Sequence, residues 1–248
     1  MIALTETWHG VRPLIQKEKW TLVFDGIPMF AGLNEKQQSW LADRLNYATY
    51  PAGVDIITAG DQGERVYIIH KGTVKVFMPQ VDGSEVTVVI LGPGDTVGEL
   101  SLLDDDERSA SVGTLEETQV FWMTRDHLEE AMQFMPVLAR NLLRILSKRL
   151  RFSTSNIQSL ACLDVNGRVA QQLLVFAERY GKKAANGDIY IAIRLPQNDI
   201  AELVGASRKR VNQTMVSLKR DGCISIDNEY HITIHDRRTL EEWANIRV

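Results

Sequence analysis

The chain has 248 residues, of which 44% are hydrophobic and 24% are charged, the composition of an ordinary globular protein. It contains no apolar run long enough to span a bilayer, and its first residues lack the basic segment and apolar core of a signal peptide. Its two cysteines, Cys162 and Cys223, are too few for a disulfide framework and wrongly spaced for a zinc or iron–sulfur site. We expect both to be buried and reduced, in a cytoplasmic protein.

Charge is unevenly distributed along the chain, whose formal net charge is −4. Residues 1–163 hold 15 Lys+Arg and 21 Asp+Glu, whereas residues 164–248 hold 13 and 11. The length suffices for two domains, and the asymmetry separates an acidic half from a mildly basic one. A basic domain of such modest charge needs clustered charges if it is to bind phosphates.

The N-terminal half begins with an extension, residues 1–22, that shows little pattern and could be a packed helix or an arm. A short amphipathic helix is predicted between Gly32 and Leu45, with Leu33, Trp40 and Leu41 among its apolar positions. Short β-branched or aromatic segments separated by glycine turns then run from Ala48 to Thr124: Val54–Ile57, Val66–Ile69, Val74–Phe77, Val86–Ile90 and Val120–Met123. This spacing predicts a β-roll, or jelly roll, within residues 23–135.

Residues 125–162 change to helical spacing. After Pro136, a seam steps by alternating three and four: Leu143, Leu146, Leu150, Ser153, Ile157 and Leu160. A heptad seam favours a parallel helix pair in a dimer over a helix that lies on its own domain. We therefore expect a dimerisation helix over residues 136–163, in which the polar Ser153 needs a partner, either water or a bound molecule.

The C-terminal domain, residues 164–248, begins with a helix over Val165–Tyr180 that Asp164 caps. Its inward positions are Val169, Leu173, Leu174 and Phe176. A turn and a strand over Ile189–Ile193 follow, then two helices, a hairpin of Cys223–Ile226 with Tyr230–Ile234, and a last helix over Leu240–Ile246.

The two helices within residues 197–218 have helix-turn-helix spacing. The first buries Ile200, Ala201 and Val204; Gly205 permits a tight turn, and Ser207 caps the second. In the second helix, Val211, Met215 and Leu218 face inward. Lys209, Gln213, Val216 and Arg220 lie on the opposite face.

A helix that presents such side chains from its N-terminal half suits the base edges of the DNA major groove, and the hairpin would form a wing. A three-helix packing motif with a solvated basic face is the alternative. The hairpin and the extended positive face favour binding to double-stranded DNA. The candidate DNA-binding residues are Gln197, Asn198, Ser207, Arg208, Lys209, Asn212, Gln213, Lys219 and Arg220.

A second candidate site surrounds an acidic loop in the predicted roll: Gly98, Glu99, Leu100 and Ser101 precede the loop, and Arg108, Ser109 and Ala110 follow it. Gly98 lets the backbone approach a ligand, amides of the following short helix can donate to a phosphate, and Arg108 supplies a fixed positive charge. An internal Glu99–Arg108 ion pair without any ligand fits the spacing equally well.

The chain resembles the CRP/FNR family over residues 27–235. The likeness rests on the sheet-and-turn pattern, on the two segments around the acidic loop, on Leu160–Ala170 and on Val204–Arg208. It implies an α+β protein: a cyclic-nucleotide-binding-type β-roll, a long dimerisation helix and a winged helix-turn-helix. It also implies a homodimer on a palindromic operator, a hinge at Asp164 and RNA polymerase as a candidate partner.

For the effector, the resemblance implies a cyclic nucleotide, with Glu99 on the ribose, Arg108 and Ser109 on the cyclic phosphate, and Ser153 and Thr154 on the base. We expect cyclic AMP first, and cyclic di-GMP, another ligand or no ligand as alternatives. The acidic loop Asp104–Glu107 departs from the pattern, so base specificity is open. Lys209 and Gln213 replace a glutamate and an arginine, so the operator should differ at those steps.

An enzyme is the rival class. The histidines His9, His70, His127, His231 and His235 do not cluster as a metal-binding cupin requires, and the chain shows no credible Ser/His/Asp order. We therefore expect no enzyme activity, no covalent or metal cofactor and no membrane partner.

Overall fold

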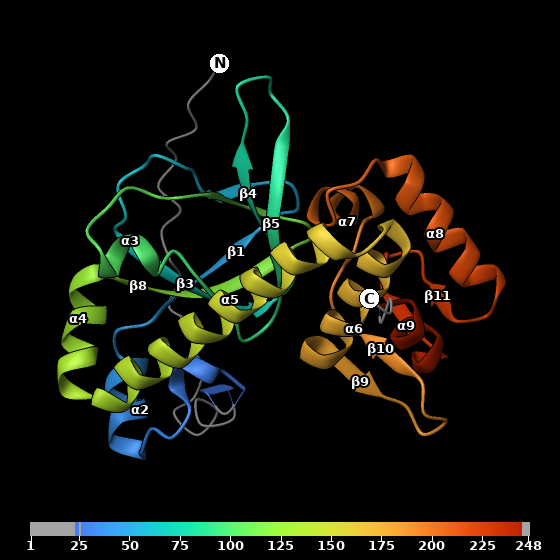
Figure 1. The fold of residues 1–248 in the computed structure, drawn as a ribbon. Coiled ribbons are helices and arrows are strands. Elements are labelled where there is room, and N and C mark those ends of the chain that lie inside the picture. The colour runs from blue at the N-terminus through green and yellow to red at the C-terminus, as the bar shows by residue number, and fades with distance from the viewer. Residues whose placement is uncertain (1–22, 25, 245–248) are drawn as a thin grey trace. The chain divides into compact units, whose positions relative to one another are not determined.

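The computed structural model describes residues 23–24 and 26–244 (Figure 1). The predictions for residues 1–22, and for Ile246 at the end of the last helix, fall outside the described residues. The described chain divides into two compact units. The first runs up to Val74 and includes Pro93–Leu146, and the second combines Lys75–Gly92 with the residues from Ser147 onward.

The first unit is built around antiparallel strands, as the alternating apolar segments predict. Its strands are β1 (Asn46–Tyr50), β2 (Asp55–Ile57), β3 (Arg65–Lys71), β6 (Thr96–Val97), β7 (Ser111–Thr114) and β8 (Thr118–Thr124). One sheet has the order β1-β8-β3-β6, with Tyr67 opposite Trp122 between β3 and β8, and β2 pairs with β7. The strands β1, β6 and β7 escaped the sequence analysis because they lack an uninterrupted β-branched run.

The helices of this unit are the short η1 (Pro28–Phe30), α2 (Glu35–Ala42), α3 (Leu100–Leu103), α4 (Arg125–Phe134) and the first part of α5 (Pro136–Cys162). Asn34 caps α2 in a capping box with Gln37, which fixes the start of the predicted amphipathic helix. Leu33, Leu41 and Leu45 are buried as predicted. They join Phe24, Phe30, Phe121, Leu128, Leu138 and others in one apolar core.

The second unit contains the hairpin of β4 (Val74–Pro79) and β5 (Glu85–Leu91), the end of α5, and the C-terminal domain. That domain consists of α6 (Val165–Tyr180), β9 (Gly181–Lys183), β10 (Ile189–Ile191), α7 (Gln197–Leu203), α8 (Arg208–Arg220), β11 (Ile224–Ile226), β12 (Ile232–Ile234) and α9 (Arg237–Ala244). Its sheet has the order β11-β12-β10-β9. Helix α6 packs against α8, α9 and β10.

Helix α6 begins where the sequence predicts. The Asp164 side chain accepts a hydrogen bond of 2.8 Å from the backbone N–H of Gly167, which satisfies one of the free amides of the first turn. Val169, Leu173 and Phe176 are buried, and Leu174 is half-buried. The predicted hairpin also forms, with Ile224 opposite Ile234.

One prediction about the cysteines is wrong. Cys223 is buried, but Cys162 is exposed, because it is the last residue of α5 and nothing in the described chain covers it. The sequence places an apolar side chain there but does not indicate which face of the helix end it occupies.

Candidate effector and DNA-binding sites

Gly98 and Arg108 lie in contact in the first unit, as the motif spacing suggested. Gly98 has a φ of +80°, and a Cβ there would lie 2.7 Å from Arg108 Nη1 and 3.1 Å from the carbonyl oxygen of Arg65. Only glycine therefore permits both the backbone conformation and the close approach of the guanidinium.

Arg108 is buried, with 8% of its surface exposed. Its guanidinium donates to the carbonyl of Gly98 at 2.6 Å, the hydroxyl of Ser101 at 2.7 Å and the carbonyl of Arg65 at 2.6 Å. Burial lowers the pKa of Arg108, and the charge of Arg125 acts in the same direction, whereas Tyr67 and Glu99 oppose the shift. An arginine in such a site stays protonated at neutral pH, so it attracts an anion.

The remaining effector candidates of the roll differ in exposure. Glu99 and Ser101 are buried, Leu100 and Ser109 are exposed, and Ala110 is half-buried. The structure thus places a carboxylate, a hydroxyl and a guanidinium in one buried cluster. The charge of Glu99 favours the protonated form of Arg108, which agrees with both the ligand-binding and the internal ion-pair interpretation of this pair.

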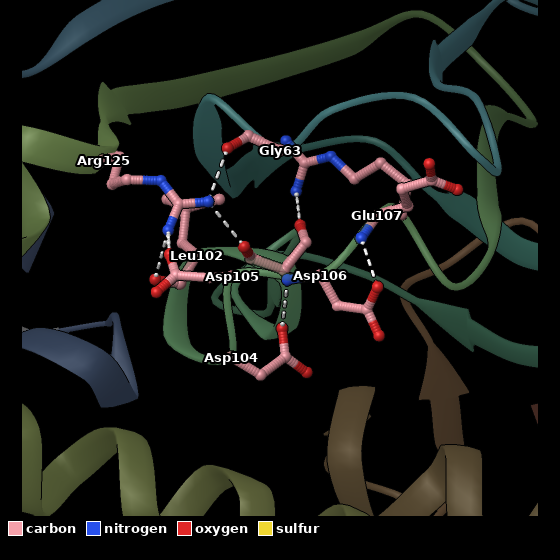
Figure 2. Close-up of polar contacts among 9 residues, drawn as sticks. Gly63, Leu102, Asp104, Asp105, Asp106, Glu107 and Arg125 are labelled. Atoms are coloured by element: carbon pink, nitrogen blue, oxygen red, sulfur yellow. Dashed lines mark hydrogen bonds and ion pairs between the residues drawn. The ribbon is translucent and has the colours of Figure 1, made fainter.

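Arg125, the first residue of α4, is a polar residue of this region that the sequence motifs do not indicate. Figure 2 shows its guanidinium reaching the end of α3 and the acidic loop. It donates to the carbonyls of Ser101 at 2.7 Å, Gly63 at 3.0 Å and Leu102 at 3.2 Å, and it forms an ion pair with Asp105. Nothing in the local sequence around Arg125 signals contacts with residues that lie 20 to 62 positions away.

The helix-turn-helix of the second unit consists of α7 and α8. Gly205 has a φ of +59° in the turn between them, and Ser207 caps α8 by accepting from the backbone N–H of Arg210. Ile200, Ala201 and Val204 are buried, as are Val211, Met215 and Leu218. Thr214 of α8 also donates to Asn166 of α6 at 2.7 Å, which fixes α8 on the domain.

The opposite face of α8 is exposed and polar. Its exposed residues are Arg208, Lys209, Arg210, Asn212, Gln213, Val216, Lys219 and Arg220. At the start of α7, Gln197 is half-buried, and the exposed Asn198 donates to Glu202 at 2.8 Å. The structure therefore gathers the predicted basic and amide side chains of α8 on one exposed face of the helix.

Comparisons with known proteins identify a domain family for each of the two regions that hold the candidate sites. A model of the cyclic nucleotide-binding domain matches residues 47–133, and a model of the Crp-like helix-turn-helix domain matches residues 167–243. A CRP-like cAMP-activated global transcriptional regulator of Mycobacterium tuberculosis is 36% identical over 216 residues, which cover 87% of this chain and 96% of the relative. The chain belongs to the CRP/FNR family.

Two other proteins align with this chain over nearly their whole length. The cyclic AMP receptor protein of Thermus thermophilus is 29% identical, over 88% of this chain and 97% of the relative. The solved structure of FixK2 from Bradyrhizobium japonicum has a TM-score of 0.71 at 21% identity, over 82% of this chain and 99% of that one, and supports the fold. The chain is thus a transcription regulator of this family, with a cyclic nucleotide-binding domain and a DNA-binding helix-turn-helix.

Helix α5 exposes apolar side chains at the positions of the predicted seam. Leu143, Leu150, Ile157 and Leu160 are 66%, 70%, 69% and 50% exposed in the single chain, and Leu146 is half-buried. Ser153 and Thr154 are exposed on the same helix, and the Thr154 hydroxyl donates to the carbonyl of Leu150 at 3.0 Å. Exposed leucines at this spacing are typical of a surface that contacts another helix.

A Ser–His–Asp contact does arise in the second unit, although the sequence order offered no sign of one. His235 Nδ1 lies 2.8 Å from Asp188 Oδ2, and His235 Nε2 lies 2.9 Å from Ser225 Oγ. The hydrogen bond from His235 lowers the pKa of Asp188. These residues join β11, the end of β12 and the turn before β10, so we interpret the contact as one that holds the winged sheet together.

Two further features bear on the rival interpretations. Among the described residues, no group of three or more His, Cys, Asp or Glu side chains is placed to hold a metal ion. Within that same part of the chain, no helix has the length and apolar character to cross a membrane. The relative from Mycobacterium tuberculosis is described as a global transcriptional regulator.

Proposed function

We propose that this chain is a homodimeric, sequence-specific transcription regulator whose affinity for palindromic operators depends on a cyclic nucleotide, with cyclic AMP as the first choice. The observation that carries the proposal is the buried Arg108 guanidinium beside Gly98 and Ser101, inside a matched cyclic nucleotide-binding domain. The M. tuberculosis relative at 36% identity is described as cAMP-activated, which favours this nucleotide over cyclic di-GMP.

In this proposal Arg108 and Ser109 bind the cyclic phosphate, and Glu99 accepts from a ribose hydroxyl. The Gly98–Ser101 backbone, Leu100 and Ala110 line the same site. The present hydrogen bonds of Arg108 to carbonyl oxygens keep its charge at the site before the anion arrives. A charged donor held in place in this way loses little conformational entropy on binding.

The exposed seam of α5 pairs two copies of the chain, and Ser153 and Thr154 meet the base. We assign residues 23–135 to the effector domain, 136–163 to the dimerisation helix and 164–248 to the DNA-binding domain. Asp164 lies at the hinge between the last two, and RNA polymerase is a candidate partner of the complex in the cytoplasm.

DNA binding is assigned to α7 and α8. Arg208 and Gln213 contact base edges, Lys209 contacts a base or a phosphate, and Lys219 and Arg220 contact the backbone. A bound effector raises operator affinity only if it binds the DNA-binding conformation of the dimer more tightly than the other conformation.

A thermal-unfolding screen tests the effector. Wild type and Arg108→Gln are mixed with cyclic AMP, cyclic GMP and cyclic di-GMP. At about 100 times its Kd, a ligand that binds only the native state adds about 2.7 kcal/mol to the free energy of unfolding and raises Tm. We expect cyclic AMP to stabilise wild type and to have little effect on the variant.

The outcomes separate the alternatives. Stabilisation by cyclic di-GMP alone would name that effector in place of cyclic AMP. No stabilisation by any nucleotide, together with unassisted operator binding, would support a ligand-independent regulator.

A further inference from the structure

Arg125 connects three segments of the effector domain. Its backbone N–H donates to the carbonyl of Glu64 at 3.0 Å, and its side chain binds Gly63 in the same loop. The side chain also binds the carbonyls of Ser101 and Leu102 in α3 and the carboxylate of Asp105 in the acidic loop (Figure 2). One guanidinium therefore holds the loop before β3, the end of α3 and the loop after α3 together.

Helix α3 depends on such an external donor. It has four residues, so the carbonyls of its last turn have few partners within the helix. The planar guanidinium offers five N–H donors in fixed directions and can bind two carbonyls of one turn. The contact with Asp105, whose side chain is 84% exposed, contributes little by comparison, because water screens exposed ion pairs.

Asp105 nevertheless shows that the loop is held in an unusual conformation. It has a φ of 58°, in the left-handed region that few residues other than glycine adopt. Such a backbone persists where surrounding contacts determine it, and Arg125 supplies one of them.

Ser101 links Arg125 to the proposed phosphate site. Its carbonyl accepts from Arg125, and its hydroxyl accepts from Arg108 at 2.7 Å. Ser101 packs closely against the loop before β3: if Gly63 carried a Cβ atom, that atom would lie only 2.3 Å from the Ser101 hydroxyl. Ser101 therefore has little room to move toward this loop. Displacement of the Ser101 carbonyl would therefore also displace the Ser101 hydroxyl, which is one of the three acceptors of the Arg108 guanidinium and its only side-chain acceptor among them.

We propose that Arg125 is a positioning residue of the effector site: it holds Ser101, and through Ser101 the Arg108 guanidinium, in the orientation that binds the cyclic phosphate. The inference rests on the proposed function, because it assumes that a cyclic nucleotide binds beside Arg108. Arg125 itself does not touch the nucleotide.

The test compares full-length wild type with Arg125→Gln, Arg125→Lys and the control Arg44→Gln. The Arg44 side chain is 29% exposed and the Arg125 side chain is 26% exposed. Like Arg125, Arg44 binds a carboxylate, that of Glu130, and a backbone carbonyl, that of Trp40. It takes no part in the α3 contacts described above. Calorimetry measures the Kd of cyclic AMP and of its Sp and Rp phosphorothioate diastereomers, which differ only in the phosphate oxygen that sulfur replaces.

We expect Arg125→Gln to weaken cyclic AMP binding about tenfold or more. A tenfold loss of affinity corresponds to about 1.4 kcal/mol. This is less than the contribution of one hydrogen bond from a charged group. The ratio of the Sp and Rp affinities should move toward one, since a misplaced Arg108 no longer distinguishes the two phosphate oxygens. Arg125→Lys should recover part of both effects, and Arg44→Gln should match wild type.

Three results would overturn the inference. Arg125→Gln could bind like Arg44→Gln. It could also lose affinity with an unchanged Sp/Rp ratio and a lowered Tm, which would indicate only a less stable fold. If wild type itself bound no cyclic nucleotide, the proposed function would fail first, and the inference with it.

Discussion

Arg108 and Arg208 carry the same guanidinium group in opposite surroundings. Arg108 is buried and bonded to carbonyls of its own domain, whereas Arg208 is exposed in the first turn of α8. Replacing Arg108 removes structural hydrogen bonds together with any ligand contact, so effects on binding and folding must be measured together. At Arg208, the exposed surroundings allow a direct test of DNA contact.

Replacing Arg208 with Ala should separate base readout from charge. We expect the affinity for the cognate operator to fall by about 1–3 kcal/mol, with little change on random DNA, because a base-edge contact is lost. Lys219→Ala is the matched cation control. Lys219→Ala should weaken binding to all DNA sequences alike. It should also reduce, by about one unit, the slope of the logarithm of the binding constant against the logarithm of the salt concentration. Fluorescence anisotropy across a salt series measures the affinity and its salt dependence. If Arg208→Ala lost equal affinity for the cognate operator and for random DNA, Arg208 would not contact a base.

Lys209→Glu tests which base α8 reads. A carboxylate accepts from the amino group of cytosine, whereas an ammonium group prefers guanine or phosphate. We expect binding selection on randomised duplexes to return sites that differ at one base step between wild type and variant. Identical preferred sites would mean that Lys209 does not face a base.

At the scale of the element, α5 and α6 show two ways in which a helix is specified. Helix α5 presents an apolar seam that is exposed among the described residues, while α6 is defined locally by the Asp164 cap and its buried face. The first feature concerns assembly, and the second concerns the stability of the fold.

Leu150→Asp tests the seam. Leu150 is 70% exposed in the single chain, so the substitution costs little there but places a charge in the apolar contact of a dimer. By light scattering at micromolar concentration, we expect the variant to form monomers or aggregates and the wild type to form dimers. Gln158→Asp makes the same change in charge at an exposed position outside the seam and should remain dimeric. A monomeric wild type would contradict the proposal.

Asp164→Ala tests the cap of α6. Loss of the bond from the Gly167 amide should lower the free energy of unfolding by about 1 kcal/mol, measured with urea. Asp164→Asn keeps an accepting oxygen and should remain within a few tenths of a kcal/mol of wild type. If Asn were as damaging as Ala, the charge of Asp164 rather than its capping bond would be the important property.

At the scale of the whole molecule, the proposed homodimer would regulate transcription by placing its two DNA-binding domains on two half-sites together. A dimer of helix-turn-helix domains places its recognition helices about one turn of DNA apart, so half-site spacing reports the assembled geometry. In the proposed function, the effector changes the positions of the two DNA-binding domains only if its affinity differs between the DNA-binding and the other conformation of the dimer.

Inserting about 5 bp, half a turn, between the half-sites should strongly reduce binding by the cyclic AMP complex, because the second half-site then faces away. Electrophoretic mobility shift with and without nucleotide measures the effect. An operator of normal spacing with one half-site scrambled is the control and should bind as weakly as the lengthened operator. Equal affinity for the normal and lengthened operators would show that single domains bind independently.

The sequence by itself determined the features that depend on neighbouring residues. Glycine turns and β-branched runs predicted most strands, Asp164 and Ser207 predicted helix starts, and the spacing of Val211, Met215 and Leu218 predicted the buried face of α8. Each signal lies within one or two turns of chain, where backbone geometry and capping chemistry decide the outcome.

Only the tertiary structure decided the contacts between residues distant in sequence. Arg125 binds the carbonyl of Ser101, 24 positions away, and His235 meets Asp188, 47 positions away. The same holds for the strand β1, whose partner β8 lies far along the chain, and for the exposure of Cys162. Such contacts depend on how strands and helices pack, and periodicity along the chain does not encode which side chains that packing brings together.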